Sequence, residues 1–439
     1  MKLKHLEKRK ILILGLGLEG IDSFIFLKKI FPKKVLGVGD RLSLEELNNQ
    51  TRKLIKENKE VKLHLGKDYL KALKKYDIII KSPGIPPRRI KPFLTKKQEV
   101  ISSTKIFFDN CPGKIVGITG TKGKSTTSSL IYKILKENLI KAYLVGNIGK
   151  PALSFLLLAK PNNVYVYELS SHQLLDVKKS PQIAVFLNIY PEHLDYYQGF
   201  KEYVKAKANI AKYQNKEDFL VYNSEDRIVK GIAQKSKAEK ISINSVKIKN
   251  INTHLKGKFN LQNIKAAMAV GRIFKISDKN IIKAIKRFKP LPHRLEYIGV
   301  YKGIKFYNDA LATIPEATMA ALDTLGQDVQ TIFLGGFDRG RKFDKLVKRI
   351  SKSKIKNIIL FQTTGDIIWR EIISQKKEKQ FKVFIVQNME DAVKLGFGFT
   401  KKGKICLLST ASPSFGLFRN YKEKGNLFKK YIKKHGKAR

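Results

Sequence analysis

The stretch Lys114–Leu135 constrains the fold most strongly, because three different patterns follow one another there without a gap. An apolar run (KIVGIT) leads into a loop (GTKGKS), and an amphipathic run (TTSSLIYKIL) follows. Backbone N–H groups converge in such a loop, and the N-terminus of the following helix adds partial positive charge. We therefore predict a strand, a phosphate-binding loop and a helix, with Lys124 at the outer phosphates and the Ser125 hydroxyl on Mg²⁺.

This loop departs from the general phosphate-loop pattern at one position. The pattern G-x-x-x-x-G-K-[ST] requires glycine at position 118, but the chain has Ile118, with Gly117 one place early. A glycine-rich turn without a ligand is the alternative, and Gly-Lys-Ser between a strand and a helix disfavours it. The residues predicted to bind ATP here are Gly120, Thr121, Lys122, Gly123, Lys124, Ser125 and Thr126.

Short β-rich runs alternate with longer amphipathic segments along the whole chain, which is typical of parallel α/β architecture. The predicted strands are Ile11–Leu14, Lys34–Val38, Asp77–Lys81, Ile115–Thr119, Val164–Leu169, Ile183–Asn188, Ile332–Leu334, Ile358–Phe361 and Ile405–Leu408. At 439 residues the chain is too long for one core. We expect three domains, at 1–103, 104–291 and 292–439, with a hinge at Pro290 and Pro292 because proline disfavours a continuing helix.

A second glycine motif, GLGLEG, lies near the N-terminus. Gly15, Gly17 and Gly20 fit G-x-G-x-x-G, and Asp40 ends the next predicted strand. Taken alone, this motif favours a dinucleotide-binding unit and an NAD-dependent dehydrogenase. The same geometry serves any nucleotide whose diphosphate rests on a helix N-terminus. It therefore predicts a nucleotide-diphosphate site of unspecified identity.

Acidic and imidazole side chains follow two further predicted strands. Glu168 ends one apolar run, and Asn188, Glu192, His193 and Asp195 lie just past the next. Parallel sheets present ligands at the carboxyl ends of their strands. A carboxylate and an imidazole at adjacent strand ends can complete a magnesium shell that ATP phosphates and a serine hydroxyl begin.

The formal charge of +51 would suit a nucleic-acid-binding ATPase. The excess is mostly lysine and is spread along the chain, and no nucleic-acid-binding motif is present, so we expect a general lysine bias and anionic substrates. Runs 62–75 and 342–356 alternate charge with apolar residues, which predicts solvated helix faces. Cys111 and Cys406 form no disulfide framework, and no apolar stretch is long enough to span a bilayer. We expect a cytoplasmic protein.

Eight motifs occur in the order found in one enzyme family: GITGTKGKST, GNIGKPAL, YELSSHQL, NIYPEHLDYY, PHRLE, YNDALATIPEAT, GGFDRG and LLSTASPSFGLFRNYKEKG. By these motifs the chain resembles the Mur ligases from about Gly15 to Phe428. The resemblance implies a Rossmann-like N-terminal domain for a uridine nucleotide rather than NAD. It also implies a central phosphate-loop ATPase domain with a parallel sheet, and a C-terminal Rossmann-like α/β domain for an amino acid.

The resemblance also assigns roles to single residues. It places Leu18, Glu19, Asp40, Arg41, Ser82, Asn147 and His193 at the uridine-linked substrate. It places Asn260, Asn263, Arg294 and Asp309 around ATP. Its metal ligands are Ser125, Glu168, His193 and, if carbamylated, Lys207. Its catalytic residues are Lys124, His193 and Lys207.

The incoming amino acid is assigned to the C-terminal domain in the same way, at Thr313, Arg339, Ser414 and Tyr421. Hydroxyls and a cation suit a dicarboxylate. The chain has Ala310 and Leu311 where the family has serine and lysine, Arg339 for a usual lysine and Tyr421 for a usual phenylalanine. A related branch that adds L-glutamate also lacks that first lysine. D-glutamate is favoured, and L-glutamate stays open.

The activity implied is ATP-dependent addition of glutamate to UDP-N-acetylmuramoyl-L-alanine, through an acyl phosphate, in peptidoglycan precursor synthesis. Two Mg²⁺ ions accompany ATP. We expect a monomer that neither binds nucleic acid nor inserts into a membrane.

Overall fold

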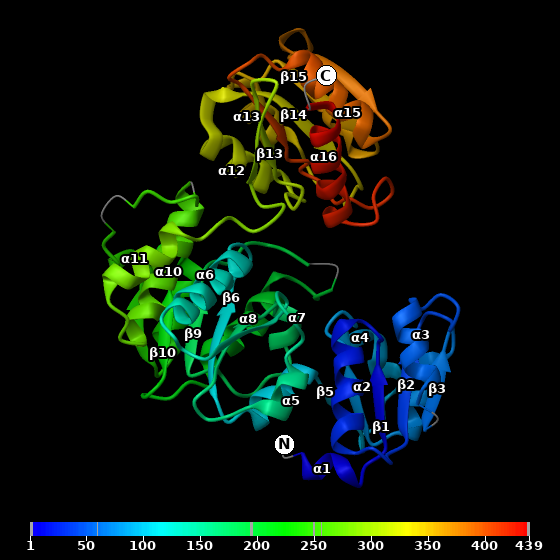
Figure 1. Ribbon diagram of the computed structural model, residues 1–439. Helices are drawn as coiled ribbons and strands as arrows, with labels where there is room; N and C mark the ends of the chain where they lie inside the picture. Colours follow the sequence, from blue (N-terminus) through cyan, green and yellow to red (C-terminus); the bar gives the residue numbers. More distant parts are fainter. Residues whose placement is uncertain (1–2, 59, 194–195, 249–250, 256, 437–439) are drawn as a thin grey trace. The chain divides into compact units, whose positions relative to one another are not determined.

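The computed structural model describes residues 3–58, 60–193, 196–248, 251–255 and 257–436. They form two compact units, one of Met1–Thr253 with Phe259–Phe288 and the other of His254–Lys258 with Lys289–Arg439 (Figure 1). The chain enters the second unit for the last time after Phe288, two residues before Pro290 of the predicted hinge. Each predicted strand overlaps a strand of the structure, so the prediction of an α/β fold with parallel sheets is confirmed.

The first unit contains two parallel sheets. The first sheet has the order β3-β2-β1-β4-β5. Its region comprises α1 (Lys4–Glu7), β1 (Ile11–Leu14), α2 (Leu18–Ile30), β2 (Leu36–Asp40), α3 (Asn49–Lys56), β3 (Val61–Leu65), η1 (Tyr69–Lys75), β4 (Ile78–Lys81), α4 (Pro87–Ile90), η2 (Lys91–Phe93), β5 (Glu99–Ile101) and α5 (Ser103–Asn110). All four residues of β1 are buried, as expected for a central parallel strand.

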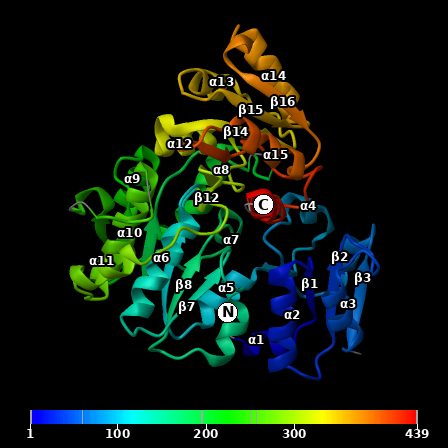
Figure 2. The same ribbon diagram turned by 45° about the horizontal axis from the view of Figure 1, so that its top comes forward.

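The second sheet of this unit has the order β11-β10-β9-β6-β8-β7, again all parallel. Its elements are β6 (Lys114–Thr119), α6 (Lys124–Glu137), β7 (Ala142–Gly146), η3 (Leu153–Leu158), β8 (Val164–Glu168), α7 (Ser171–Leu174), β9 (Ile183–Phe186), α8 (Phe200–Lys212), β10 (Phe219–Tyr222), α9 (Arg227–Lys235), β11 (Glu239–Ser242), η4 (Ile243–Ser245), α10 (Lys258–Ile273) and α11 (Asp278–Lys286). Helix α6 packs on β6, β7 and β8 (Figures 1 and 2). The loop before α6 therefore lies at the carboxyl edge of the central strand β6.

The second unit is built on one mixed sheet, β12-β13-β17-β14-β15-β16, in which only β12 runs antiparallel among the described strands. Its elements are β12 (Glu296–Tyr301), β13 (Ile304–Asn308), α12 (Pro315–Leu325), η5 (Gly326–Asp328), β14 (Val329–Gly335), α13 (Asp344–Ser351), β15 (Asn357–Phe361), α14 (Thr364–Ser374), η6 (Glu378–Gln380), β16 (Lys382–Val386), α15 (Met389–Phe399), β17 (Ile405–Leu408) and α16 (Tyr421–Gly436). Alternate residues of β14 face opposite cores, with Ile332 against α12–α14 and Phe333 against α15 and α16.

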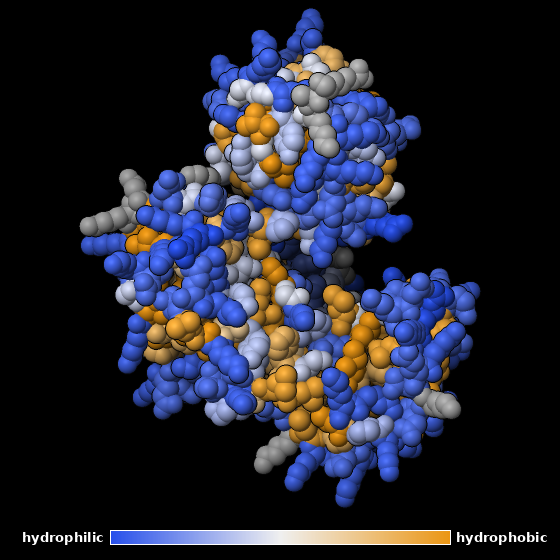
Figure 3. Space-filling model, in the orientation of Figure 1, coloured by the Kyte–Doolittle hydropathy of each residue, from blue (hydrophilic) through white to orange (hydrophobic). Residues whose placement is uncertain are grey.

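The prediction of a helix face over 62–75 is wrong. That run contains β3 and the short helix η1. The residues VKLHL alternate with the period of an edge strand, and five residues are too few to separate this period from a helical one. The run 342–356 does contain a helix, α13. On the face shown in Figure 3, hydrophilic residues lie over both units rather than over one element.

Candidate functional site

The phosphate loop links β6 to α6, and Asn188 holds it in place. Gly120 and Gly123 have φ angles of 157° and 88°, which glycine adopts without strain. The N–H groups of Thr121 and Lys122 donate to the backbone and side-chain oxygens of Asn188, at 2.9 and 2.8 Å. The Asn188 amide donates back to the Lys122 carbonyl at 3.1 Å. Asn188, which follows β9, thus fixes the shape of the loop.

Helix α10 lies directly beside this loop. A Cβ atom at Gly123 would lie 2.4 Å from Oδ1 of Asn263, so only glycine fits there. The same Oδ1 accepts a hydrogen bond from Thr127 at 3.1 Å, and the Asn263 amide donates to Asn260 at 3.1 Å. The structure therefore brings both asparagines to the phosphate loop.

Lysine side chains surround the loop. The Lys124 amine donates to the carbonyls of Gly120 and Thr121 at 2.8 and 2.9 Å, folding back over the loop. The Lys122 amine pairs with Glu192 at 2.9 Å. Ser125 is buried in the first turn of α6, where N–H groups and the helix dipole favour an anion. These groups form a binding site suited to phosphate.

Glu168 ends β8, next to the strand that carries the loop, and is 1% exposed. Its Oε1 accepts from the Asn147 amide at 3.0 Å, whereas its Oε2 is buried and has no hydrogen-bond partner among the described residues. A buried carboxylate oxygen without a donor is costly in a folded protein. A divalent cation would satisfy this oxygen, so the residue fits Mg²⁺. The described residues contain no group of three His, Cys, Asp or Glu that could hold a metal alone.

Lys207 is the most unusual group of the site, because it is a lysine that is 1% exposed and makes no ion pair among the described residues. Its amine donates to the Gly120 carbonyl at 2.9 Å and to the Thr119 hydroxyl at 3.3 Å, and lies 5.1 Å from the centre of the Tyr203 ring. Burial, together with the charge of Lys124, lowers the pKa of Lys207 well below its usual value of 10.5. A neutral amine is a nucleophile, which a protonated one is not.

His193 follows β9 with a φ angle of 58°, and its ring lies 4.8 Å from that of His172. Asp195 lies outside the described residues. Nearby, the Tyr196 hydroxyl contacts the carbonyls of Pro83 and Ile85, at 2.8 and 3.1 Å, joining this segment to the turn after β4. A pocket of about 410 Å³ opens beside Tyr196, within the usual size range of ligand sites. Its lining includes Lys81 and Val100 of the first sheet, and His172 and Glu202 of helices α7 and α8.

The first βα turn is closed by its own polar residues. Asp40 accepts from the N–H groups of Leu16 and Leu42 at 2.6 and 3.0 Å, and the Ser82 hydroxyl donates to the Gly15 carbonyl at 2.8 Å. Asp40 and Ser82 therefore shape the turn itself. Leu18 and Arg41 are exposed beside it.

Glu19 is half-buried and contacts residues of α5 and α7. Its two carboxylate oxygens accept from the Gln173 amide, at 2.7 Å, and from the Ser103 hydroxyl. Burial raises the pKa of Glu19, and these hydrogen bonds oppose the rise. The carboxylate thus connects α2 to α5 and α7 within the first unit.

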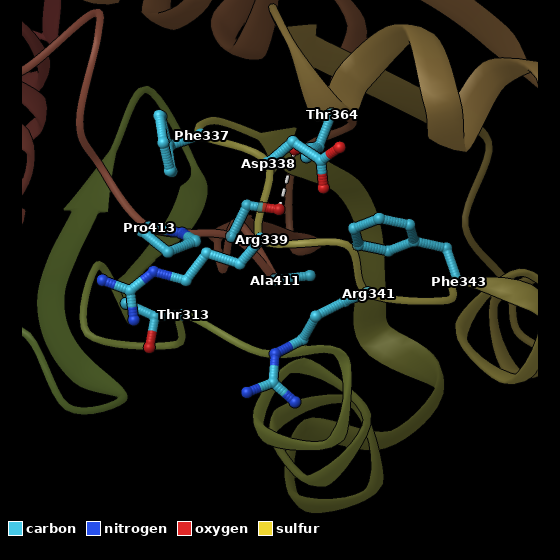
Figure 4. Close-up of a pocket in the computed structure, with 10 residues that line it drawn as sticks. Thr313, Phe337, Asp338, Arg339, Arg341, Phe343, Thr364, Ala411 and Pro413 are labelled. Carbon is cyan, nitrogen blue, oxygen red and sulfur yellow. Dashed lines mark hydrogen bonds between the residues drawn. The ribbon is translucent and has the colours of Figure 1, made fainter. Parts of the chain in front are cut away.

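A small polar pocket lies in the second unit, at the carboxyl ends of β14 and β17. Its lining includes two of the predicted amino-acid residues, Thr313 and Arg339, and also Arg341 (Figure 4). Ser414 and Tyr421 do not line it. Ser414 is buried and its hydroxyl has no partner among the described residues, and the Tyr421 ring lies 6.0 Å from that of His293.

Asp309 and Arg294, predicted at ATP, belong to the second unit. Asp309 accepts from the Leu295 N–H at 3.0 Å and from the Ser409 hydroxyl at 2.9 Å. Burial raises the pKa of Asp309 to about 7. Since its oxygens are engaged inside this unit, Asp309 stabilises the segment after β13.

Two family models match the chain: the Mur ligase middle domain over residues 118–250, and the Mur ligase glutamate ligase domain over residues 293–411. The UDP-N-acetylmuramoylalanine–D-glutamate ligase of Acetivibrio thermocellus is 31% identical, covering 98% of this chain and 97% of the relative. The corresponding ligase of Clostridium botulinum is 33% identical, covering 97% of each.

Solved structures show the same fold. The UDP-N-acetylmuramate-alanine ligase of Thermotoga maritima has a TM-score of 0.62 at 15% identity, covering 97% of this chain and all of that one. A MurF ligase of Thermotoga maritima in complex with ADP has a TM-score of 0.61 at 17% identity, covering 99% of this chain and all of that one.

The chain therefore belongs to the Mur ligase family, an outcome that confirms the resemblance seen in its motifs. Within that family, the curated relatives above, similar over nearly their full length, are D-glutamate ligases. None of the described helices combines the length and apolarity needed to cross a bilayer.

Proposed function

We propose that this protein is an ATP-dependent ligase that joins D-glutamate to UDP-N-acetylmuramoyl-L-alanine in peptidoglycan precursor synthesis. The observation that carries the proposal is the phosphate loop before α6 with the buried, half-satisfied Glu168 on the adjacent strand. A nucleotide-binding site of this kind, in a chain similar over 97% of its length to D-glutamate ligases, favours this reaction over the alternatives. It disfavours a dehydrogenase, which would leave the loop without a role.

In this proposal residues 1–103 bind the uridine nucleotide, 104–291 bind ATP and 292–439 bind the amino acid. The first βα turn supplies N–H groups for the diphosphate, with Leu18 and Arg41 exposed to the nucleotide. The acceptor carboxylate would then lie toward Asn147 and His193. The pocket beside Tyr196 is lined by Lys81 and Tyr196, which are close in sequence to Ser82 and His193. It offers room for the muramoyl part of the substrate.

The carboxylate of the acceptor attacks the γ-phosphorus of ATP, which gives an acyl phosphate and ADP. Negative charge spreads over the transferring phosphoryl group, and Lys124 and the N–H groups of the loop and α6 stabilise it in place. Mg²⁺ on Glu168 and Ser125 would supply further charge neutralisation between the phosphates. Asn188, Asn260 and Asn263 hold the loop in its phosphate-binding shape.

Lys207 gains a chemical role from its burial. Its amine, which burial favours in the neutral form, can add to CO₂ with loss of a proton and become a carbamate. That change replaces a buried cation by oxygen ligands suited to a second Mg²⁺. Among the described residues no carboxylate lies within ion-pair distance of this amine, and the charges of Glu192 and Glu168 only partly offset the effect of burial on its pKa. This environment supports the assignment.

The glutamate amine then attacks the acyl carbon, and the tetrahedral intermediate loses phosphate to leave the amide. We assign the amino acid to the second unit, at the pocket lined by Thr313 and Arg339. Movement about Pro290 and Pro292 would deliver the amine and exclude water from the acyl phosphate. Because ATP and nucleotide sugars are cytosolic metabolites, we place the reaction in the cytoplasm. A single chain would supply all three binding sites, so the proposal requires no second subunit.

Trapping of the acyl phosphate tests this function directly. The protein is incubated with ATP, Mg²⁺, UDP-N-acetylmuramoyl-L-alanine and hydroxylamine, without glutamate. We expect a hydroxamate of the acceptor and an equal amount of ADP, and neither product from Lys124→Ala. ADP formed without hydroxamate, or hydroxamate formed without ATP, would overturn the proposal.

A further inference from the structure

Two arginines without acidic partners share the small pocket of the second unit. Arg339 and Arg341 both line it, with the hydroxyl-bearing Thr313, Thr364 and Ser412 (Figure 4). Neither arginine makes an ion pair or a hydrogen bond with any residue that the structure describes. The guanidinium of Arg339 lies 6.0 Å from the centre of the Phe415 ring. The carboxylate of Asp338 also lines the pocket, so its lining carries two positive charges against one negative charge. This excess of positive charge favours the binding of an anion.

The fold, rather than a free loop, sets the position of these arginines. Their segment begins at Gly335, whose N–H donates to the Thr410 carbonyl at 2.9 Å, and the Phe337 N–H donates to the Pro413 carbonyl at 2.9 Å. The segment ends at Phe343, which is buried in the core beneath α13. Between the arginines, Gly340 has a φ angle of 67°, which lets the chain turn sharply.

The lining chemistry matches a dicarboxylate. A guanidinium binds a carboxylate through two parallel N–H···O contacts, so two guanidinium groups suit two carboxylates. Asp338 precedes Arg339 in the sequence. One oxygen of its carboxylate is engaged, because it accepts a hydrogen bond from the Gly340 N–H at 2.8 Å. The enclosed part of the pocket is only about 10 Å³, the room of one water. One carboxylate oxygen fits this space, and the remaining atoms of an amino acid would extend into the open part of the pocket.

We propose that Arg341 is a second carboxylate-binding residue of the amino-acid site, so that Arg339 with Thr313 receives one carboxylate of glutamate and Arg341 receives the other. The proposal rests on the proposed function and deepens it, because it explains selection of a dicarboxylic amino acid. Arg341 is half-buried beside the pocket, whereas the adjacent Lys342 is exposed and does not line it. Lys342 therefore offers a matched control of equal charge.

Steady-state kinetics with glutamate and its two mono-amides test the proposal. Arg341→Ala should raise the KM for D-glutamate about 10- to 100-fold, the usual effect of losing a charged hydrogen-bonded pair. The KM for ATP should stay within about twofold, Arg341→Lys should recover part of the loss, and Lys342→Ala should behave as wild type. D-glutamine lacks the side-chain carboxylate and D-isoglutamine lacks the α-carboxylate.

The two amides separate the roles of the two arginines. The penalty of Arg341→Ala should disappear for the amide that lacks its carboxylate, and the penalty of Arg339→Ala should disappear for the other amide. An unchanged KM for glutamate in Arg341→Ala, or loss of both penalties on the same amide, would overturn the inference. Hydroxamate trapping needs no amino acid, so wild type that fails there refutes the proposed function instead. Retained trapping and an unchanged melting temperature show that Arg341→Ala is folded.

Discussion

Replacing Lys424 with methionine should change how the stability of the second unit depends on pH. Lys424 lies in α16, is 1% exposed, and its amine contacts the Thr410 hydroxyl. Burial lowers the pKa of Lys424 to about 7 from 10.5, and the charge of Asp309 opposes this change. Methionine has a similar length, is apolar and cannot be protonated.

The sign and size of the effect follow from proton linkage. Between pH 7 and pH 10.5 the unfolded chain binds a proton on Lys424 that the folded chain has lost. The free energy of unfolding therefore rises with pH across this window, by about 1.4 kcal/mol per pH unit. From pH 7.5 to 9.5 the gain is about 3 kcal/mol, which corresponds to about 5–10 °C in melting temperature for a unit of this size. The pKa of Asp309 is also raised to about 7, so its contribution to the free energy of unfolding falls as the pH rises toward 7. Above pH 7 this contribution changes little.

Thermal melts of wild type and Lys424→Met at pH 7.5, 8.5 and 9.5 measure this difference. We expect the melting temperature of wild type to rise relative to the variant at each step, because other titrating groups are common to both proteins. Lys422→Met, at an exposed lysine two residues earlier, is the control and should follow wild type. Parallel curves for wild type and Lys424→Met would refute the reasoning.

Three further predictions concern the phosphate loop. Lys124→Ala should lower kcat by a factor of about 10³, as loss of a transition-state charge contact does, while retained turnover in an ADP-release assay would remove the loop from the mechanism. Gly123→Ala should weaken ATP binding in calorimetry, because its Cβ would lie 2.4 Å from the Asn263 side chain; unchanged affinity would mean that the loop adapts freely. Lys207→Ala should lose activity and recover part of it with short carboxylic acids that replace carbamate oxygens, and an unaffected variant would contradict the assignment.

Much of the fold was predictable because buried parallel strands are continuous apolar runs. Runs such as Ile11–Leu14 and Ile358–Phe361 are buried along their whole length and need no pairing partner to be recognised. Edge strands lack this signal. In β3 the lysine and histidine side chains are not fully buried, so charged and apolar residues alternate there. This pattern was interpreted as the face of a helix. The hairpin β12–β13 was missed because Gly299 interrupts its alternation at a bulge.

The parts of the site that local sequence determines could be predicted. The parts that depend on contacts between distant residues could not. The phosphate loop follows from its glycines and Lys124. The hydrogen bonds from Asn188 to the phosphate loop depend on the pairing of β6 with β9. No local sequence pattern predicts this pairing. Lys207 was one lysine among many in sequence, and only the structure shows its burial. Arg341 was missed because its position at the pocket depends on the turn at Gly340.

Phosphate release on UDP-N-acetylmuramoyl-L-alanine, with D-glutamate and L-glutamate compared side by side, tests the central claim most directly. The reaction contains ATP and Mg²⁺, and each of the three substrates is omitted in turn. We predict phosphate release with D-glutamate only, at one phosphate per amide bond, and none when any substrate is missing. Release with L-glutamate alone would assign the protein to a different amino acid, and release without the uridine-linked acceptor would contradict the ligase account.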